Sequence, residues 1–268
     1  MFSRALIASL ALVPFAVAQT SSVDIAAIEA HFEQSALVPD LFPSFTPSAL
    51  LTLDYPGVGE AEPGQLFTKE QVGPTPTVTV VPANSSVSLS GTYTLAMVDA
   101  DIVGSKLPEG QTRHWLVNGV TISGSTVNNA SAVGITTYAG PWPAAGSGPH
   151  RQVPFPPSTF SAPAAFSQPN MGVSVFDFNA YVRDSGLGPL IAANYITVEE
   201  GTATASIPAT SAVVTSTLAA GSSASSSSGS STGTSDASSP TTSTSGAAAL
   251  SAKLLSAMVA AGLAILVV

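Results

Sequence analysis

The sequence predicts an all-β-dominated fold, an antiparallel β-sandwich with a few short helices. From position 50 onward the chain consists of short runs of β-branched and aromatic residues. Clusters of glycine, proline and asparagine separate these runs, and a helical pattern of apolar residues occurs in only two short stretches. Many short strands with few helices between them favour an antiparallel sandwich or barrel over a parallel sheet built from βαβ units.

The two helical stretches lie near the two ends of the predicted domain. Residues 22–32 place an apolar side chain every three or four positions and begin with Ser22, a residue type that caps helix N-termini. His31 lies beside this apolar stripe, and we expect it to face solvent. Residues 177–185 show the same spacing and end before Gly186, a typical helix stop.

The predicted strands share a length of three to six residues and a high content of valine, isoleucine, threonine and aromatic residues. In chain order they are residues 77–81, 87–89, 93–98, 115–117, 119–122, 172–176 and 195–198.

Both ends of the chain resemble processing signals. Residues 1–18 combine an early arginine, an apolar run and a small-x-small cleavage site, which is typical of a secretory signal peptide. Residues 246–268 begin with small residues and end in an uncharged apolar tail. That tail is short for a membrane span and is followed by no basic residue. This pattern predicts a glycolipid (GPI) attachment signal that is removed from the mature protein.

Between these ends, the composition divides the chain into two parts. Residues 209–245 are mostly serine, threonine, alanine and glycine, and such a segment buries too little apolar surface to fold. We expect it to be a disordered, O-glycosylated stalk. Residues 19–208 are long enough for one domain with its own core. The acceptor sequons at Asn84 and Asn129 predict glycosylated surface loops within that domain.

The composition excludes several classes of protein. The chain of 268 residues contains no cysteine, so the fold does not depend on disulfides or on thiolate zinc sites. Of the seven basic residues, Arg4 and Lys253 lie in the segments expected to be removed, which leaves five against 16 acidic residues. This acidic balance argues against nucleic acid or an anionic membrane surface as the partner.

A few titratable residues form the candidate site. Asp99 and Asp101 are two positions apart at a predicted strand end, so their side chains can share one face. His114 begins the next predicted strand, and His150 ends a loop dense in glycine and proline. Imidazoles and loop amides can hold a phosphate or sulfate, while a carboxylate can hold a hydroxyl or an ammonium group.

Each of these residues also has a purely structural interpretation. His150 can satisfy backbone groups of its own loop, and His114 can be a core histidine hydrogen-bonded to an acid. Asp101 can cap backbone amides at a turn. Arg151 is expected to pair with an acid or to pack against the loop, and Trp115 to lie in the core.

Two motifs resemble those of the phosphatidylethanolamine-binding protein family. The first is Asp99-Ala100-Asp101 followed by His114-Trp115-Leu116-Val117, and the second runs from Tyr138 to Arg151 as Y-A-G-P-W-P-A-A-G-S-G-P-H-R. The similarity extends over about residues 37–199. The chain as a whole resembles a secreted, GPI-anchored member of fungal type.

The resemblance implies an antiparallel β-sandwich with a small pocket near one end that binds phosphate-like anions and phospholipid head groups. It implies that the pocket is lined by Asp99, Asp101, His114, Pro143 and His150. Family members also inhibit proteases or kinases through surfaces outside the pocket.

The chain departs from the family pattern at four places. The two prolines of the first motif are replaced by Ala100 and, at or next to its position, Val103, which leaves the loop after Asp101 less constrained. Gln152 stands where an aromatic residue is expected, and Trp142 stands where a small residue is common. These changes predict a reshaped pocket.

We therefore expect a non-enzymatic binding protein, without a cofactor or a metal, displayed on the cell surface or wall through a GPI anchor. Its ligand would be a small anion, a phosphorylated head group or a protein partner. One alternative is an inhibitor of a secreted or vacuolar hydrolase, which would act through an extended segment at residues 19–36. A metal-dependent enzyme built on the two histidines and an aspartate is the other alternative.

Overall fold

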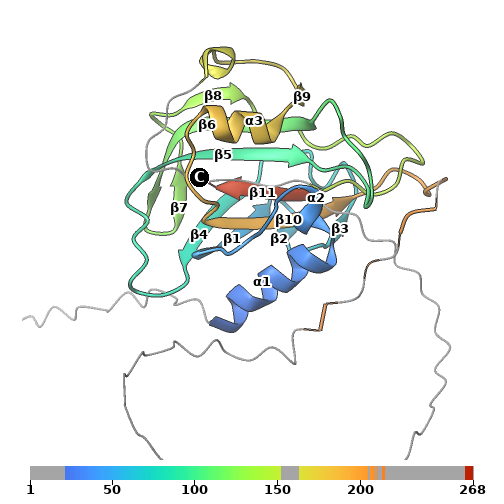
Figure 1. The fold of residues 1–268 in the computed structure, drawn as a ribbon, viewed down its shortest axis with the longest axis horizontal. Coiled ribbons are helices and arrows are strands. Elements are labelled where there is room, and N and C mark those ends of the chain that lie inside the picture. Colours follow the sequence, from blue (N-terminus) through green and yellow to red (C-terminus); the bar gives the residue numbers. More distant parts are fainter. Residues whose placement is uncertain are drawn as a thin grey trace, which may run out of the picture.

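The computed structural model describes residues 22–151, 163–204, 206–208, 210 and 213–214, and the backbone of residues 263–267. These residues form a β-dominated fold with a few short helices, as the sequence predicts (Figure 1). The predicted signal peptide 1–18 and Gln152 lie outside the described residues, as does most of the predicted stalk and of the predicted C-terminal signal.

The strands and helices have the following bounds. The strands are β1 (Ala49–Tyr55), β2 (Gly59–Glu60), β3 (Leu66–Phe67), β4 (Thr77–Pro82), β5 (Thr92–Asp99), β6 (Gln111–Ser123), β7 (Thr126–Asn128), β8 (Val133–Thr136), β9 (Ser174–Phe176), β10 (Ala192–Val198) and β11 (Leu263–Val267). The helices are α1 (Ser22–Gln34), α2 (Leu37–Asp40), the 3-10 turn η1 (Ala164–Phe166) and α3 (Phe178–Asp184).

The strands pair in the order β2-β1-β4-β7-β6-β5-β11-β10-β3, and β8 and β9 pair with β6. Every described pairing is antiparallel except that of β10 with β3. In Figure 1, α3 lies beside β5 and β6, whereas α1 lies on the far side of β1 and β10. The helices therefore cover opposite sides of the strand framework.

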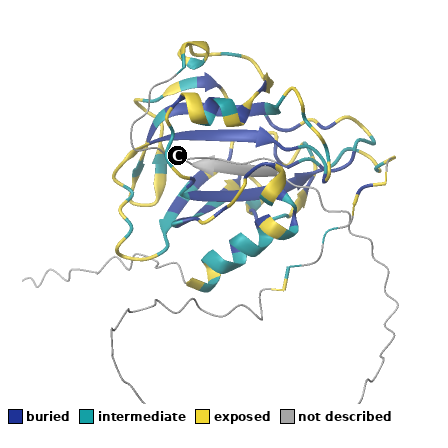
Figure 2. Cartoon of the chain, viewed as in Figure 1, coloured by how far each residue is buried: buried dark blue, intermediate teal, exposed yellow. Residues whose placement is uncertain are grey.

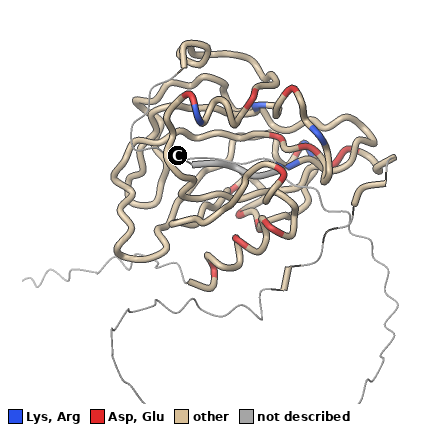
Figure 3. Tube along the Cα trace, in the orientation of Figure 1, with Lys and Arg blue, Asp and Glu red and all other residues tan. Residues whose placement is uncertain are grey.

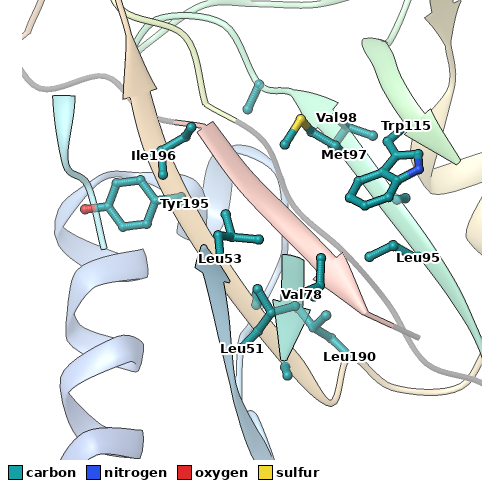
Figure 4. Packing of buried hydrophobic residues seen from close by; sticks show 14 of the residues in the cluster. Leu51, Leu53, Val78, Leu95, Met97, Val98, Trp115, Leu190, Tyr195 and Ile196 are labelled. Atoms are coloured by element: carbon teal, nitrogen blue, oxygen red, sulfur yellow. The ribbon is translucent and has the colours of Figure 1, made fainter. Parts of the chain in front are cut away.

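The core is centred on β5 and β10. All seven residues of β10 are buried, and seven of the eight residues of β5 are buried (Figure 2). In β1 every second residue is buried, which leaves Leu51, Leu53 and Tyr55 on the inner face. Figure 4 shows Leu51 and Leu53 packed near Val78 and Ile196. Strands that are covered on both faces are largely apolar, and the polar residues buried in β5 and β10 are Thr94, Asp99, Asn194 and Thr197.

The two predicted helices are confirmed. On α1 the buried residues are Ile28 and Phe32, and the Phe32 ring stacks on Phe45 with 4.1 Å between centroids. The side chain of Asp177 caps α3 by accepting a hydrogen bond from the amide of Ala180. This cap and the apolar stripe explain why so short a segment forms a helix.

Two strand predictions are wrong in detail. Residues 87–89 form no strand, because Asn84 accepts hydrogen bonds from the amides of Ser86 and Val87 and closes a turn there. The two runs at 115–117 and 119–122 belong to one long strand, β6, whose glycine at position 119 has a positive φ of 90°. Glycine adopts this conformation without the strain that a Cβ would cause, so the strand continues through it.

The position of β11 bears on the expected removal of residues 246–268. Leu263–Val267 pairs with β5 on one side and with β10 on the other. If the tail is removed as the sequence predicts, β5 and β10 lose the strand between them. Among the described residues, no helix is both long and apolar enough to cross a membrane.

Candidate functional site

The site begins where β5 ends. Asp99 is the last residue of β5 and pairs with Thr112 of β6. The register shifts next to this pair, because Met97 pairs with Trp115 while Val98 pairs with Arg113. His114 is thus the extra residue of a β-bulge, a feature that re-aims side chains.

The glycine- and proline-rich loop is held in place by the end of β10 and the segment that follows it. The amide of His150 donates to the carbonyl of Val198 over 3.3 Å, and the amide of Gly146 donates to that of Glu200 over 2.9 Å. Gly148 has a φ of 92°, and a Cβ there would lie 2.3 Å from the Cδ1 atom of Ile207. Only glycine fits this position, and the backbone path that it permits carries His150 to Asp99.

His150 lies between two carboxylates. Its Nδ1 atom lies 2.7 Å from Oδ2 of Asp99, and its Nε2 atom lies 3.3 Å from Oδ1 of Asp101. The structure therefore brings together three of the residues that the resemblance assigns to the pocket. A charged imidazole in this position would bridge both acids.

Asp101 has a structural role as well. Its φ of 59° is in the left-handed region, and its amide donates to Oδ1 of Asp99 over 2.7 Å. Its own Oδ1 accepts from the amide of Ile102 over 2.7 Å. The turn-capping interpretation is thus confirmed, and it coexists with the contact to His150.

His114 lies behind Asp99. Its side chain is buried, with Nε2 4.0 Å from Oδ2 of Asp99 and Nδ1 3.1 Å from the carbonyl of Ala139. The interpretation of a core histidine is confirmed, but its hydrogen bond goes to the carbonyl of Ala139 and not to an acid.

The pKa values of the two histidines are shifted in opposite directions. Burial lowers the pKa of His150, but the hydrogen bond and charge of Asp99, together with the charge of Asp101, outweigh it and raise this pKa above 6.5. Burial lowers the pKa of His114 below 6.5, and the attraction of Asp99 offsets this only in part. At neutral pH, His150 is therefore protonated more readily than His114.

A cavity of about 210 Å³ opens at His150. Its wall consists of Asp99, Asp101, Leu107, Pro108, Glu109, Gly110, Thr112, His150 and Val175. Pro143 and His114, which the resemblance assigns to the pocket, are buried outside this wall. Trp142 is 65% exposed and is also outside it.

Two residues that shape the site, Ser147 and Glu109, were not expected from the sequence. Ser147 places its hydroxyl oxygen 3.2 Å from Nε2 of His150 while that hydroxyl donates to the carbonyl of Ala144 over 2.7 Å. Glu109 adds a third carboxylate to the cavity wall. Ser147 could have been found from its spacing, since it is three residues from His150 in one rigid loop.

Arg151 holds the loop that carries Asp101. This side chain is fully buried and donates to the carbonyls of Ser35, Ala100, Asp101 and Ile102. Its Nη1 atom also lies 2.9 Å from Oδ2 of Asp40. The expected pairing of Arg151 with an acid is confirmed, and the same guanidinium ties the α1–α2 junction to the site.

The charges of the cavity wall favour a ligand that bears both signs. Asp99, Asp101 and Glu109 face a single imidazole, and no lysine or arginine is among the described wall residues. The amides of Asp101 and Ile102 donate to the carboxylates of Asp99 and Asp101, so they are not available to an anion. No group of three or more potential metal ligands occurs among the described residues.

Asn84 and Asn129 are both exposed and lie outside the strands, in agreement with the expected surface loops.

Comparisons with known proteins give the following results. Residues 44–154 match the family model described as phosphatidylethanolamine-binding protein. No curated protein sequence matches the chain. The chain is similar to a solved carboxypeptidase Y inhibitor complexed with its cognate proteinase, with a TM-score of 0.49 and 19% identity over 67% of this chain and 95% of that one.

It is also similar to two Plasmodium structures. The phosphatidylethanolamine-binding protein from Plasmodium vivax has a TM-score of 0.48 and 15% identity, over 63% of this chain and 96% of that one. The one from Plasmodium falciparum has a TM-score of 0.44 and 18% identity, over 63% and 96%.

Proposed function

We propose a binding function from one premise: this chain carries a domain of the phosphatidylethanolamine-binding protein family, over residues 44–154. Its ligand is a small phosphorylated head group that also bears an ammonium or hydroxyl group. The observation that carries this proposal is the placement of His150 between Asp99 and Asp101 at the wall of a cavity of about 210 Å³.

The chemistry of the wall supports a ligand with two signs of charge. A phosphate oxygen can accept from Nε2 of protonated His150 in place of Asp101, whose contact at 3.3 Å is the longer of the two carboxylate contacts. An ammonium group can then pair with the carboxylates of Asp101 and Glu109. A doubly negative anion without an ammonium group would face three carboxylates and one cation. We therefore expect it to bind more weakly than a ligand that carries both charges.

The proposed function is non-enzymatic. Ser147, His150 and Asp99 lie in hydrogen-bond sequence, as in a nucleophilic triad. However, the Ser147 hydroxyl donates to the carbonyl of Ala144, so its proton does not point at Nε2 of His150, and Nε2 also lies 3.3 Å from Oδ1 of Asp101. The arrangement suits binding better than acyl transfer.

We further propose that the protein is secreted and displayed on the cell surface or wall by a glycosylated stalk and a GPI anchor. This proposal is supported by the signal-like pattern at residues 1–18, the stalk composition at 209–245 and the terminal segment 246–268. The exposure of Asn84 and Asn129 is compatible with glycosylation.

The alternative function, inhibition of a hydrolase, cannot use the extended N-terminal segment that was expected to carry it. It needs an extended N-terminal segment at residues 19–36, but residues 22–34 form the helix α1, which buries Ile28 and Phe32. Inhibition of a hydrolase would have to use another surface.

Thermal unfolding with O-phosphoethanolamine tests the proposed function. A ligand that binds only the folded state stabilises it by RT ln(1 + [L]/Kd), about 2.7 kcal/mol at 100 times Kd. We expect stabilisation by this compound to exceed that by phosphate or ethanolamine at equal concentration. It should weaken as the pH rises through the raised pKa of His150.

Two variants control this experiment. His150→Gln removes the cation and should abolish the stabilisation, whereas His31→Gln, which changes a histidine outside the cavity, should retain it. An unmoved melting curve at millimolar O-phosphoethanolamine would refute the proposed ligand class.

A further inference from the structure

A second cavity, larger than the first, lies between α1 and the edge formed by β1 and β2. Its volume is about 450 Å³, within the range of small-molecule sites. It shares no wall residue with the cavity at His150. Residues on one face of α1, among them Ala27, Ile28 and His31, form one wall, and Leu51 and Ala61 contribute to the other.

Most wall residues of this cavity are apolar, and its charged residues are acidic. Asp24, Glu60 and Glu62 line it, and no lysine or arginine is among its described wall residues. Figure 3 shows acidic positions along α1 and no basic position on that helix. Such a cavity attracts the positive end of a ligand and buries its apolar body.

His31 does not compensate the acidic charge. This half-buried residue lines the cavity, and its ring lies 6.2 Å from that of Tyr195. Burial lowers the pKa of His31 below 6.5, and the charge of Glu62 offsets this only in part. The imidazole is therefore mostly neutral at neutral pH, and the carboxylates determine the charge of the cavity.

We infer that the cavity between α1 and the β1–β2 edge is a second binding site, which takes a small amphiphilic amine. The apolar body of the ligand packs against Ala27, Ile28 and Leu51, and its ammonium group lies at Glu60 and Glu62. This site is independent of the head-group site, since the two cavities differ in both their walls and their position in the chain.

Isothermal titration of the purified protein with n-octylammonium tests this inference. We expect saturable binding of one n-octylammonium per chain. n-Octanoate has the same tail length and the opposite charge, and we expect at least tenfold weaker binding of it. Equal binding of the two compounds would overturn the inference, because the acidic residues would then not select the ligand.

Two pairs of variants locate the site. Ala27→Phe places a ring in the cavity and should weaken n-octylammonium about tenfold or more, while Ala26→Phe adds the same ring to the neighbouring helix position outside the wall and should not. Glu62→Gln should weaken binding about two- to fivefold, the effect of one partly exposed charge, while Glu70→Gln should have no effect.

The remaining outcomes are also decisive. Unchanged affinity in both Ala27→Phe and Glu62→Gln would refute the site. If Ala27→Phe does not fold, the comparison of Glu62→Gln with Glu70→Gln decides alone, because both replace an exposed carboxylate by a side chain of similar size. His150→Gln should bind n-octylammonium like the wild type, so loss of head-group binding and loss of amine binding are separable.

Discussion

The Nδ1 atom of His150 lies 2.7 Å from Oδ2 of Asp99, although the two residues are 51 positions apart in the chain. One residue ends a buried strand and the other ends a loop that is attached to the segment after β10. Their contact joins two separately positioned parts of the fold. Protonation of His150 should therefore affect both the cavity at His150 and the stability of the domain.

The first prediction concerns the pKa of His150. In the wild type its pKa should lie above 6.5, because the contacts with Asp99 and Asp101 outweigh the effect of burial. Asp99→Asn removes the strongest of these contacts and should lower the pKa of His150. NMR titration of the His150 ring protons measures both values. Asp54→Asn, an exposed change in β1, is the control, and a wild-type pKa below 6.5 would contradict the prediction.

The second prediction concerns the dependence of stability on pH. Because the folded state raises the pKa of His150, its ion pair stabilises the fold below pH 6.5 and loses this effect as the pH rises through the folded value. The difference in unfolding free energy between wild type and His150→Gln should thus be larger at pH 5.5 than at pH 8.5. Urea unfolding at both pH values measures it.

The pKa of His114 is lowered in the folded state, so its own contribution to stability has the opposite sign. The charge of His150 is one cause of this lowering, so His150→Gln should raise the pKa of His114, and NMR titration of His114 in both proteins measures that part of the difference. A difference that grows towards high pH would show that His150 is held in its neutral form.

The third prediction concerns Arg151. Replacing it by methionine leaves the carbonyls of Ala100, Asp101 and Ile102 without their donor and Asp40 without its cation. Each carbonyl that is left buried without its donor costs about 1–3 kcal/mol, so the midpoint of urea unfolding should fall sharply. The exposed Asp40 contributes little to this loss. Arg183→Met removes an exposed cation and should change stability by less than about 0.5 kcal/mol. Equal effects of the two variants would contradict the structural role of Arg151.

Local patterns explain which parts of the fold could be predicted. The helices α1 and α3 follow from apolar spacing within one segment, and Asp177 and Gly186 mark the limits of the second. The absence of a strand at 87–89 could not be predicted from β-propensity, because it depends on the turn that Asn84 closes and on the lack of a pairing strand.

In the site, too, some features follow from local sequence patterns and others depend on the tertiary structure. The convergence of Asp99 and His150 was expected from the resemblance, but the cavity wall at Leu107, Glu109 and Val175 comes from segments without a motif. The bulge at His114 turns it behind Asp99, and a bulge depends on strand register that a single sequence does not show. Likewise, the five polar contacts of Arg151 depend on the path of the α1–α2 junction.

The last prediction concerns the C-terminal segment, where the expected processing and the position of β11 compete. If residues 246–268 are removed, the buried amides and carbonyls of β5 and β10 lose their partners in β11. Unpaired backbone groups in a buried strand are costly, so the two strands must then pair with each other or the sheet must open. We expect direct pairing of β5 with β10.

Two measurements check this. Mass spectrometry of protein from the producing cell should find no peptides from residues 1–18 or from the apolar tail. A chain that ends at residue 245 should unfold cooperatively and keep slow hydrogen exchange at Leu95–Val98 and Ala192–Ile196, because each strand finds its partner in the other. If the shortened chain instead exchanges rapidly along both strands, β11 is a permanent part of the domain. A mature protein that retains Leu263–Val267 would support the same conclusion, and the proposed lipid anchor would then be wrong.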